Sequence, residues 1–308
     1  MNIWDILFTT EFGYMIFRVT TPILFTALGA MISRRAGIMN ISLEGLMLIG
    51  ALFGVIGSAY SQNVIVGVLA AILASLCLSL VFAYFVLKLK ADLILTGIAL
   101  NLMASGGTVF LLSILCGDKG VSTSMNSLVV PTVELPLIRN IPVLGPVLSG
   151  HNLLTYFSLV CVALVYLLIN KSSLGLRIRS VGENPAAAES VGISVVKTRF
   201  VALMITGILC GLGGAYMSMG YVSWFARDMA AGRGYMALAA QNLGNATPVG
   251  TCLASFLFGI ADAMSSSLQV LSVPAEFIQM LPYVTTVVGL IIFAMNKKRK
   301  ISKAAAKL

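Results

Sequence analysis

The sequence contains few of the residues on which enzymes depend. Its one histidine, His151, lies at the edge of an apolar run, so a histidine-based metal site or a Ser–His–Asp triad has too few residues. The patterns HExxH, GxSxG and GxxxxGKS/T do not occur. We therefore expect no catalytic residues, no metal site and no ATP hydrolysis on this chain. An intramembrane enzyme is the weakest of the functions considered.

Cysteines are also few and are not arranged as a framework. Five are present, an odd number without a CxxC pair, and each lies within or at the end of an apolar run. We predict that they are small buried hydrophobic residues that form neither disulfides nor a metal site. They are Cys77, Cys116, Cys161, Cys210 and Cys252.

The amino-terminal residues lack the basic region of a signal peptide and carry Asp5 and Glu11 instead. Apolar residues recur there at helical spacing, which predicts a short helix lying at the membrane interface. The apolar face of this helix would consist of Ile3, Trp4, Leu7 and Phe8.

Apolar sequence, by contrast, is abundant. Of the 308 residues 58% are hydrophobic and 10% are charged, and several runs near the length of a membrane span carry almost no charge. The sequence therefore predicts an all-α polytopic membrane protein with nine apolar segments. The second segment opens with polar residues and the seventh is short and polar, so either could be a broken or re-entrant helix. The segments are 13–33, 36–60, 64–87, 93–116, 152–170, 199–222, 234–248, 249–271 and 277–295.

Basic residues are distributed unequally between the two sides of the predicted membrane domain. If successive loops alternate sides, fifteen lysines and arginines fall on the side of the carboxyl terminus and four on the other. Because cytoplasmic loops are enriched in Lys and Arg, we expect the N-terminus outside and the C-terminus in the cytoplasm. The net charge of +9 then reflects a face beside anionic lipid and not nucleic-acid binding. The inner residues are Arg34, Arg35, Lys88, Lys90, Lys171, Arg177, Arg179, Lys197, Arg199, Lys297, Lys298, Arg299, Lys300, Lys303 and Lys307, and the outer ones are Lys119, Arg139, Arg227 and Arg233.

One transmembrane domain over residues 1–308 accounts for the whole chain, with the membrane bundle at 13–295. An external loop at 117–150 contains four prolines, which predict extended or short helical pieces that cover the outer mouth; an inert linker is the alternative. A cytoplasmic loop spans 172–198, and a basic cytoplasmic tail spans 296–308.

The cytoplasmic loop, SSLGLRIRSVGENPAAAESVGISVVKT, predicts a short helix in its interior. Asn184 suits the N-cap, Pro185 suits the first helical position, and Gly192 suits a left-handed end. The helix is shorter than the roughly 12–15 residues that an isolated helix needs in water, so it must pack on something. Either its alanine-rich surface docks on another protein, or it rests on its own bundle.

Polar residues inside the apolar segments are the candidates for a solute path, because each is unfavourable in a membrane unless it faces a cavity or a partner. We expect Glu44, in GIMNISLEG, to pair with Arg34 or Arg35 rather than to contact a substrate. Amides and hydroxyls around a path would suit a polar, uncharged solute, whereas each taken alone also fits a helix–helix hydrogen bond. Arg18 and Asn245 also lie in or beside spans. The candidate path residues are Asn40, Ser42, Glu44, Asn101, Gln241, Asn242 and Asp262.

Four stretches together resemble a known family. They are SRRAGIMNISLEGLMLIGA, LGLRIRSVGENPAAAESVGI, GRGYMALAAQNLGNATPVG with LFGIADAM, and MLPYV. They look like the permease subunit of bacterial ABC importers in the branch for branched-chain amino acids, simple sugars and nucleosides. The resemblance runs from about residue 15 to 295 and is closest to the nucleoside and simple-sugar subgroup.

This resemblance implies a fold similar to the cobalamin-importer type, with roughly ten helices. It implies a pore formed by two permeases, as a homodimer or a heterodimer, and a substrate-binding lipoprotein outside. ATP and magnesium would be bound by a separate cytoplasmic ATPase, with no cofactor on this chain. The helix at Asn184–Gly192 would be the coupling helix, seated in a groove of the ATPase. The coupling residues would be Gly182, Glu183, Asn184, Pro185, Ala186, Ala187, Ala188, Glu189 and Gly192.

The resemblance favours nucleosides as the solute, with simple sugars as the alternative. Glu44 stands where the nucleoside subgroup has a glutamate. GNATPVG departs from the family pattern, because the similar segment of the family often carries bulkier residues. A different class of function is a secondary transporter driven by protons or sodium. Such a transporter would need a carboxylate deep in the bundle, for which Glu44 and Asp262 are the candidates.

Overall fold

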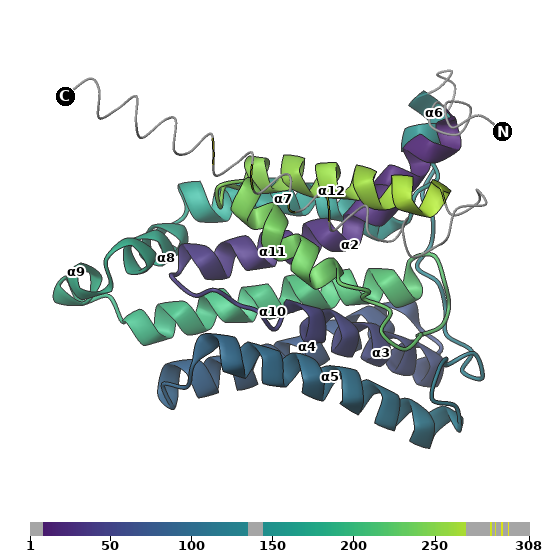
Figure 1. Cartoon of the computed structure of the whole chain (residues 1–308), viewed down its shortest axis with the longest axis horizontal. Coiled ribbons are helices and arrows are strands. Elements are labelled where there is room, and N and C mark those ends of the chain that lie inside the picture. The colour runs from purple at the N-terminus through teal and green to yellow at the C-terminus, as the bar shows by residue number, and fades with distance from the viewer. Residues whose placement is uncertain are drawn as a thin grey trace.

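The long helices of the chain run side by side in one bundle (Figure 1). The computed structural model describes residues 9–134 and 144–268, with the isolated positions 284, 287, 291 and 295. Seven helices in these residues are long and apolar enough to cross a membrane, which confirms the predicted all-α polytopic fold. They are α2 (Thr10–Arg35), α3 (Leu43–Ser61), α4 (Val64–Ala83) with its π-helical continuation η1 (Tyr84–Lys88), α5 (Leu93–Cys116), α7 (Leu153–Lys171), α10 (Val195–Met219) and α12 (Pro248–Leu268).

Some predicted features lie wholly or partly outside the described residues. These are the amino-terminal helix, residues 135–143 of the predicted external loop, residues 269–271 of the eighth apolar segment, the ninth apolar segment at 277–295 with the MLPYV stretch, and the basic tail at 296–308.

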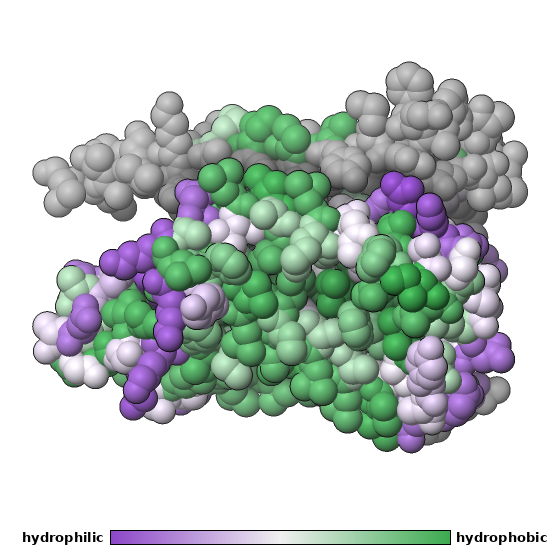
Figure 2. All heavy atoms as spheres, turned by 90° about the horizontal axis from the view of Figure 1, so that it is seen from below, coloured by the Kyte–Doolittle hydropathy of each residue, from purple (hydrophilic) through white to green (hydrophobic). Residues whose placement is uncertain are grey.

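The outer surface of α4 and α5 is apolar along the middle of the bundle. Figure 2 shows hydrophobic side chains across the middle of one face and hydrophilic ones gathered at both of its ends. Ile65 on α4, and Leu95 and Leu102 on α5, are more than half exposed. An apolar belt of this kind, on helices long enough to cross a bilayer, makes the chain a multi-pass membrane protein. Cys77 is exposed on the same surface, so the prediction that every cysteine is buried is wrong there.

Helix α10 is the central helix of the bundle and packs against α2, α3 and α4. Its glycines permit the close approach, because a Cβ on Gly214 would overlap the carbonyl oxygen of Met47 in α3. The hydroxyl of Ser218 donates to the carbonyl oxygen of Ala51 at 2.7 Å, which adds an interhelical hydrogen bond. Close packing of small residues together with such hydrogen bonds is how helices associate in a membrane, where apolar burial alone gives little gain.

Short helices mark the two ends of the bundle. Helices α8 (Ser173–Glu183) and α9 (Pro185–Ser190) lie at one end, called the α9 end below, and α6 (Leu144–Leu148) lies at the other, called the α6 end (Figure 1). At the α6 end the side-chain nitrogen of Asn152 donates to the carbonyl oxygens of Val130 and Gly220, at 2.6 and 2.9 Å. The described part of the 117–150 loop is thereby held against the end of α10.

The seventh predicted segment is not a membrane span. It overlaps α11 (Arg233–Leu243), which is only 11 residues long. The helix begins inside the bundle, where a Cβ on Gly234 would meet the backbone of Glu44, and the chain beyond it reaches Arg35 at the α9 end. Residues 220–232 reach the start of α11 from the α6 end without a regular helix. Non-helical backbone at this depth is tolerated only where it is buried in protein or lines a water-filled cavity, so the break marks a candidate site.

Candidate functional site

Asn101 connects the three segments that meet at this break. Its side-chain oxygen accepts a hydrogen bond from the Gly45 nitrogen at 2.8 Å, in the first turn of α3. Its side-chain nitrogen donates to the carbonyl oxygen of Ile41 at 2.9 Å and to the Tyr235 hydroxyl of α11 at 3.1 Å. The amide is therefore fully engaged and only 8% exposed. Its two donors and its acceptor hold the non-helical residues 36–42, α3 and α11 in one arrangement.

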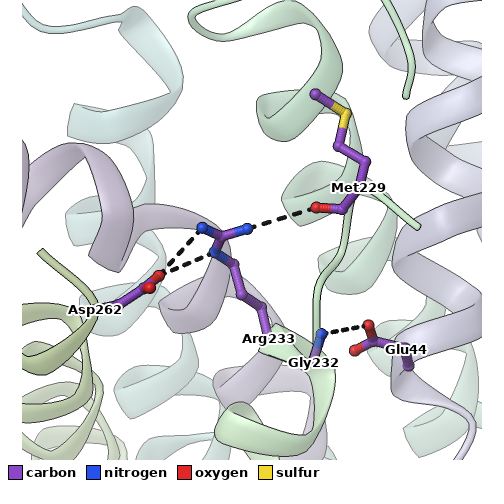
Figure 3. A network of polar contacts seen from close by, with 5 residues as sticks. All are labelled: Glu44, Met229, Gly232, Arg233 and Asp262. Carbon is purple, nitrogen blue, oxygen red and sulfur yellow. Dashed lines mark hydrogen bonds and ion pairs between the residues drawn. The ribbon is translucent and has the colours of Figure 1, made fainter. Parts of the chain in front are cut away.

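Glu44 binds the beginning of α11 and not an arginine of α2. Its two carboxylate oxygens accept hydrogen bonds from the backbone nitrogens of Gly232 at 2.8 Å and Gly234 at 2.7 Å; Figure 3 shows the first of these. A carboxylate is stabilised at a helix N-terminus because the unpaired N–H groups and the helix dipole are positive there. The predicted pairing of Glu44 with Arg34 or Arg35 is wrong, since residues 36–42 carry α3 into the bundle while the arginines stay at the α9 end.

Arg233 and Asp262 form an ion pair between α11 and α12 (Figure 3). The Nη2 and Nε atoms of Arg233 lie 3.1 and 3.2 Å from Oδ2 of Asp262, and both side chains are less than a fifth exposed. Arg233 was expected on the outer side, but it lies inside the bundle because the helix that it begins starts there. A single charge at this depth would be strongly unfavourable, so the pair explains how both residues are tolerated.

The remaining candidate path residues divide into buried and open ones. Ser42 donates hydrogen bonds from its nitrogen and its hydroxyl to the side-chain oxygen of Asn40, and both residues are almost fully buried. These two residues therefore shape the turn into α3 and do not face an opening. Gln241 is 1% exposed, whereas Asn242 is only partly buried and follows Tyr235 by two helical turns. Asn242 thus shares the outward face of α11 with Tyr235.

This outward face is polar at the depth of the bundle and is open in a single chain. Tyr235 is 46% exposed although its hydroxyl bonds Asn101, the ninth residue of α5. Met39, in the non-helical residues 36–42 that precede α3, is 49% exposed. Ser105, one turn further along α5, donates its hydroxyl to Oδ1 of Asp228 at 2.9 Å. Sequence reasoning missed Tyr235, Asp228 and Ser105, and the signal that could have found them is the interruption of the seventh segment.

Two other polar residues of the spans lie away from this site. The Arg18 guanidinium carbon lies 4.0 Å from the centre of the Tyr221 ring, a cation–π contact nearer the α6 end. Asn245 lies beyond α11 and lines a cavity with Arg34 and Arg35 at the α9 end. Among the described residues no three His, Cys, Asp or Glu side chains are grouped as metal ligands would be.

Helix α9 has the structure predicted for it. The side-chain oxygen of Asn184 accepts a hydrogen bond from the Ala187 nitrogen at 3.1 Å, and Pro185 is the first helical residue. Gly192 follows with φ +84°, the left-handed conformation expected at its end. Five of its six residues are exposed, with Ala188 the buried one. The helix therefore projects from its own bundle and leaves most of its alanine surface open (Figure 1).

The chain matches a protein family over nearly its whole length. Residues 14–297 match the branched-chain amino acid transport system / permease component family. The chain belongs to this permease family. The match confirms the resemblance seen in the sequence motifs and identifies a component of a transport system.

Several curated relatives of the permease carry transport names. It is 34% identical to the nucleoside ABC transporter permease protein NupC of Lactococcus lactis subsp. cremoris, over 89% of each chain. It is also 34% identical to the guanosine ABC transporter permease protein NupQ of Bacillus subtilis, over 87% of each. The putative glucose ABC transporter permease protein TsgC13 of Haloferax volcanii is 31% identical, over 84% of the permease and 78% of the relative.

A solved structure supports the fold. The permease superposes on a chain of a putative metal-chelate type ABC transporter in an inward-facing conformation, with a TM-score of 0.52. The superposition covers 96% of the permease and 88% of that chain at 15% sequence identity, so the likeness concerns the fold alone.

Proposed function

We propose that the permease forms half of the translocation path of an ATP-driven importer for nucleosides. The main support is the polar face at the break between α3 and α11, where Tyr235, Asn242 and the Ser105–Asp228 pair lie at membrane depth on the open side of the chain. Two of the relatives at 34% identity are named for nucleoside or guanosine transport. Polar groups on an open face at membrane depth are unfavourable in lipid, and a solute path between two subunits would remove them from it.

A second permease would cover this face. Either a second copy or a related chain can do so, which gives a homodimer or a heterodimer. The exposed apolar side chains of α5 beside the polar face, among them Leu102, would then contact the partner instead of lipid.

The chemistry of the face suits a nucleoside. A nucleoside presents ribose hydroxyls, base donors and acceptors, and a flat aromatic surface, while carrying no charge. The amide of Asn242 and the hydroxyl of Ser105 can exchange hydrogen bonds with the former, and the ring of Tyr235 offers a surface for the base. A simple sugar, the alternative suggested by the glucose-named relative, lacks the flat surface.

A separate ATPase that binds ATP and magnesium would drive the cycle through α9, and the contacts of the α9 end supply a mechanical link. Gly182 at the end of α8 abuts the carbonyl oxygen of Arg35, and Nε of Arg199 donates to the carbonyl oxygen of Ala36 at 3.1 Å. Residues 36–42 lead from there to Asn101 and α3. A push on α9 would therefore reach the site through a continuous set of packed groups.

The orientation follows from the same proposal. The α9 end faces the cytoplasm, where the ATPase is, and the α6 end faces the substrate-binding lipoprotein outside.

Ion-coupled transport is less favoured because both candidate carboxylates are engaged, Glu44 by the start of α11 and Asp262 by Arg233. Uptake into proteoliposomes that contain only this chain, driven by an ion gradient, would contradict the importer proposal.

The docking role of α9 is tested by Ala187→Glu and Pro185→Glu, with Ala187→Ser as the matched control of similar size. We expect that the ATPase does not co-purify with the glutamate variants and that their uptake rate falls at least about tenfold. Ala187→Ser should retain both the ATPase and the uptake rate. Normal assembly and transport in both glutamate variants would overturn the docking role.

The solute is tested separately by competition. Unlabelled nucleosides should compete with the uptake of labelled uridine, whereas ribose and glucose should not.

A further inference from the structure

A cavity at the α9 end is lined by three arginines from two helices. It has a volume of about 220 Å³ and lies between the end of α2, helix α8 and the turn that joins α11 to α12. Arg34 and Arg35 come from α2, Arg179 comes from α8, and Asn245 comes from the turn. Glu183 supplies the single negative charge of the lining, so the positive charges outnumber it by three to one.

The donors of these arginines are largely unused within the chain. Nε of Arg179 is buried without a hydrogen-bond partner. Arg35 uses its Nε for the carbonyl oxygen of Ala246 at 2.6 Å, which leaves its two terminal nitrogens available. Over residues 9–134 and 144–268 none of the three arginines forms an ion pair, although Glu183 lies in the same lining. The unpaired positive charges and terminal nitrogens of the three arginines, gathered in one lining, point to an anionic ligand.

The walls of the cavity are held in place by backbone contacts. A Cβ on Gly182 would overlap the Arg35 carbonyl oxygen, so α8 and α2 meet without an intervening side chain. Arg35 itself fastens α2 to the turn through Ala246. The backbones that carry the arginines are therefore fixed around one space, with the side chains of Arg35 and Arg179 partly buried and that of Arg34 exposed. Preformed donors bind a small anion better than mobile ones do, because less side-chain freedom is lost on binding.

We propose that this cavity binds a phosphate group, as a phosphate monoester or diester. Guanidinium groups present paired N–H donors that match two phosphate oxygens, and three of them around one carboxylate leave the net positive charge that such an anion needs. The cavity is smaller than the roughly 300–1,000 Å³ of ordinary small-molecule pockets, so it suits the phosphate group and not a whole nucleoside. The group can belong to an anionic phospholipid, whose phosphate lies at the depth of helix ends, or to a soluble phosphate. A bound phosphate would join α2, α8 and the α11–α12 turn, and the site does not depend on which solute is transported.

Binding is measured on the full-length permease in a phosphate-free maltoside detergent, with native mass spectrometry and thermal unfolding as readouts. The lipid probe is phosphatidic acid, with diacylglycerol as the matched lipid that lacks the phosphate, and the soluble probe is inorganic phosphate. We expect one bound phosphate group per chain and a raised unfolding temperature with at least one of the two probes. Retention of phosphatidic acid alone identifies a lipid site, and binding of inorganic phosphate identifies a soluble one. Diacylglycerol should have no effect.

Arg179→Gln is expected to weaken binding by roughly tenfold, as is Arg34→Gln, because each removes a charged hydrogen-bond donor from the lining. Arg179→Lys should weaken it nearly as much, since lysine keeps the charge but loses the paired donors. Arg177→Gln, an exposed change on the same helix, is the matched control and should leave binding intact. The proposal is overturned if neither probe binds, if Arg177→Gln weakens binding as much as Arg179→Gln, or if only addition of a partner protein raises the unfolding temperature.

Discussion

The nitrogen of Gly45 donates a hydrogen bond of 2.8 Å to the side-chain oxygen of Asn101, so an amide of α5 fixes the first turn of α3. The same amide bonds Ile41 and Tyr235, and thereby joins both edges of the break in the bundle. The geometry of the open face therefore depends on this side chain.

Asn101→Ala should lower the free energy of unfolding by about 1–3 kcal/mol, because it leaves the buried Gly45 nitrogen without a partner. It should lower the uptake rate further than this loss of stability explains, since α3 and α11 lose their common anchor. Tyr235→Phe removes only one of the three bonds and should have a smaller effect on stability. Thermal unfolding and uptake assays should show that Asn101→Ala is less stable and less active than Tyr235→Phe. If both variants were as stable as the wild type, the prediction would be contradicted.

Glu44→Gln tests how α11 begins. Glutamine keeps an acceptor for one of the two backbone nitrogens but removes the negative charge at the helix N-terminus, so we expect a destabilisation of about 1–2 kcal/mol. ATP-driven uptake should fall in proportion without a change in its dependence on sodium or pH. A shift of the ion dependence would instead support ion coupling through this carboxylate.

The Arg233–Asp262 pair should contribute far more to the stability of the permease than a surface ion pair does. Asp262→Ala leaves a buried guanidinium unpaired and should destabilise the permease by about 3–5 kcal/mol. The double substitution Arg233→Met with Asp262→Ala should recover part of this loss, because no charge is then left alone. Arg227→Ala is the control, since its pair with Asp228 is 3.6 Å long and more than half exposed, and it should change stability by about 1 kcal/mol or less. A double variant less stable than Asp262→Ala would refute the argument.

The surroundings of His151 predict how acid affects the stability of the protein. Its ring stacks on Tyr14 with centroids 4.0 Å apart, and its Nε2 lies 2.8 Å from the Val147 carbonyl oxygen. Burial lowers the pKa of His151 below its ordinary value, an effect that the hydrogen bond to Val147 partly offsets. The unfolded chain therefore takes up this proton first, and the stabilisation present above about pH 6.5 is lost as the pH falls. Unfolding temperatures between about pH 8 and pH 5 should fall less steeply for His151→Gln than for the wild type. If the unfolding temperature fell equally steeply with pH in both proteins, the lowered pKa of His151 would be contradicted.

Local chemistry was enough to predict much of this protein. The spans follow from runs of apolar residues that have the length of a bilayer crossing, and six of them agree with the observed helices to within a few residues. The short helix α9 was predictable from cap to cap, because Asn184, Pro185 and Gly192 each act on neighbouring backbone. The polar residues Asn101 and Asp262 were found because the membrane makes any polar side chain in a span exceptional.

The partners of those polar residues were decided only by the tertiary structure. Glu44 was expected beside Arg34 or Arg35, about ten residues away in the sequence, yet its hydrogen-bond donors are Gly232 and Gly234, nearly two hundred residues away. Arg233 was assigned to a loop because nothing in its local sequence marks a helix that begins in the middle of the bundle. Hydropathy reports how favourable it is to place a residue in lipid, but a hydrogen bond between distant segments depends on where the packed helices bring their backbones. The membrane topology is therefore a property of composition along the chain, and the site is a property of packing.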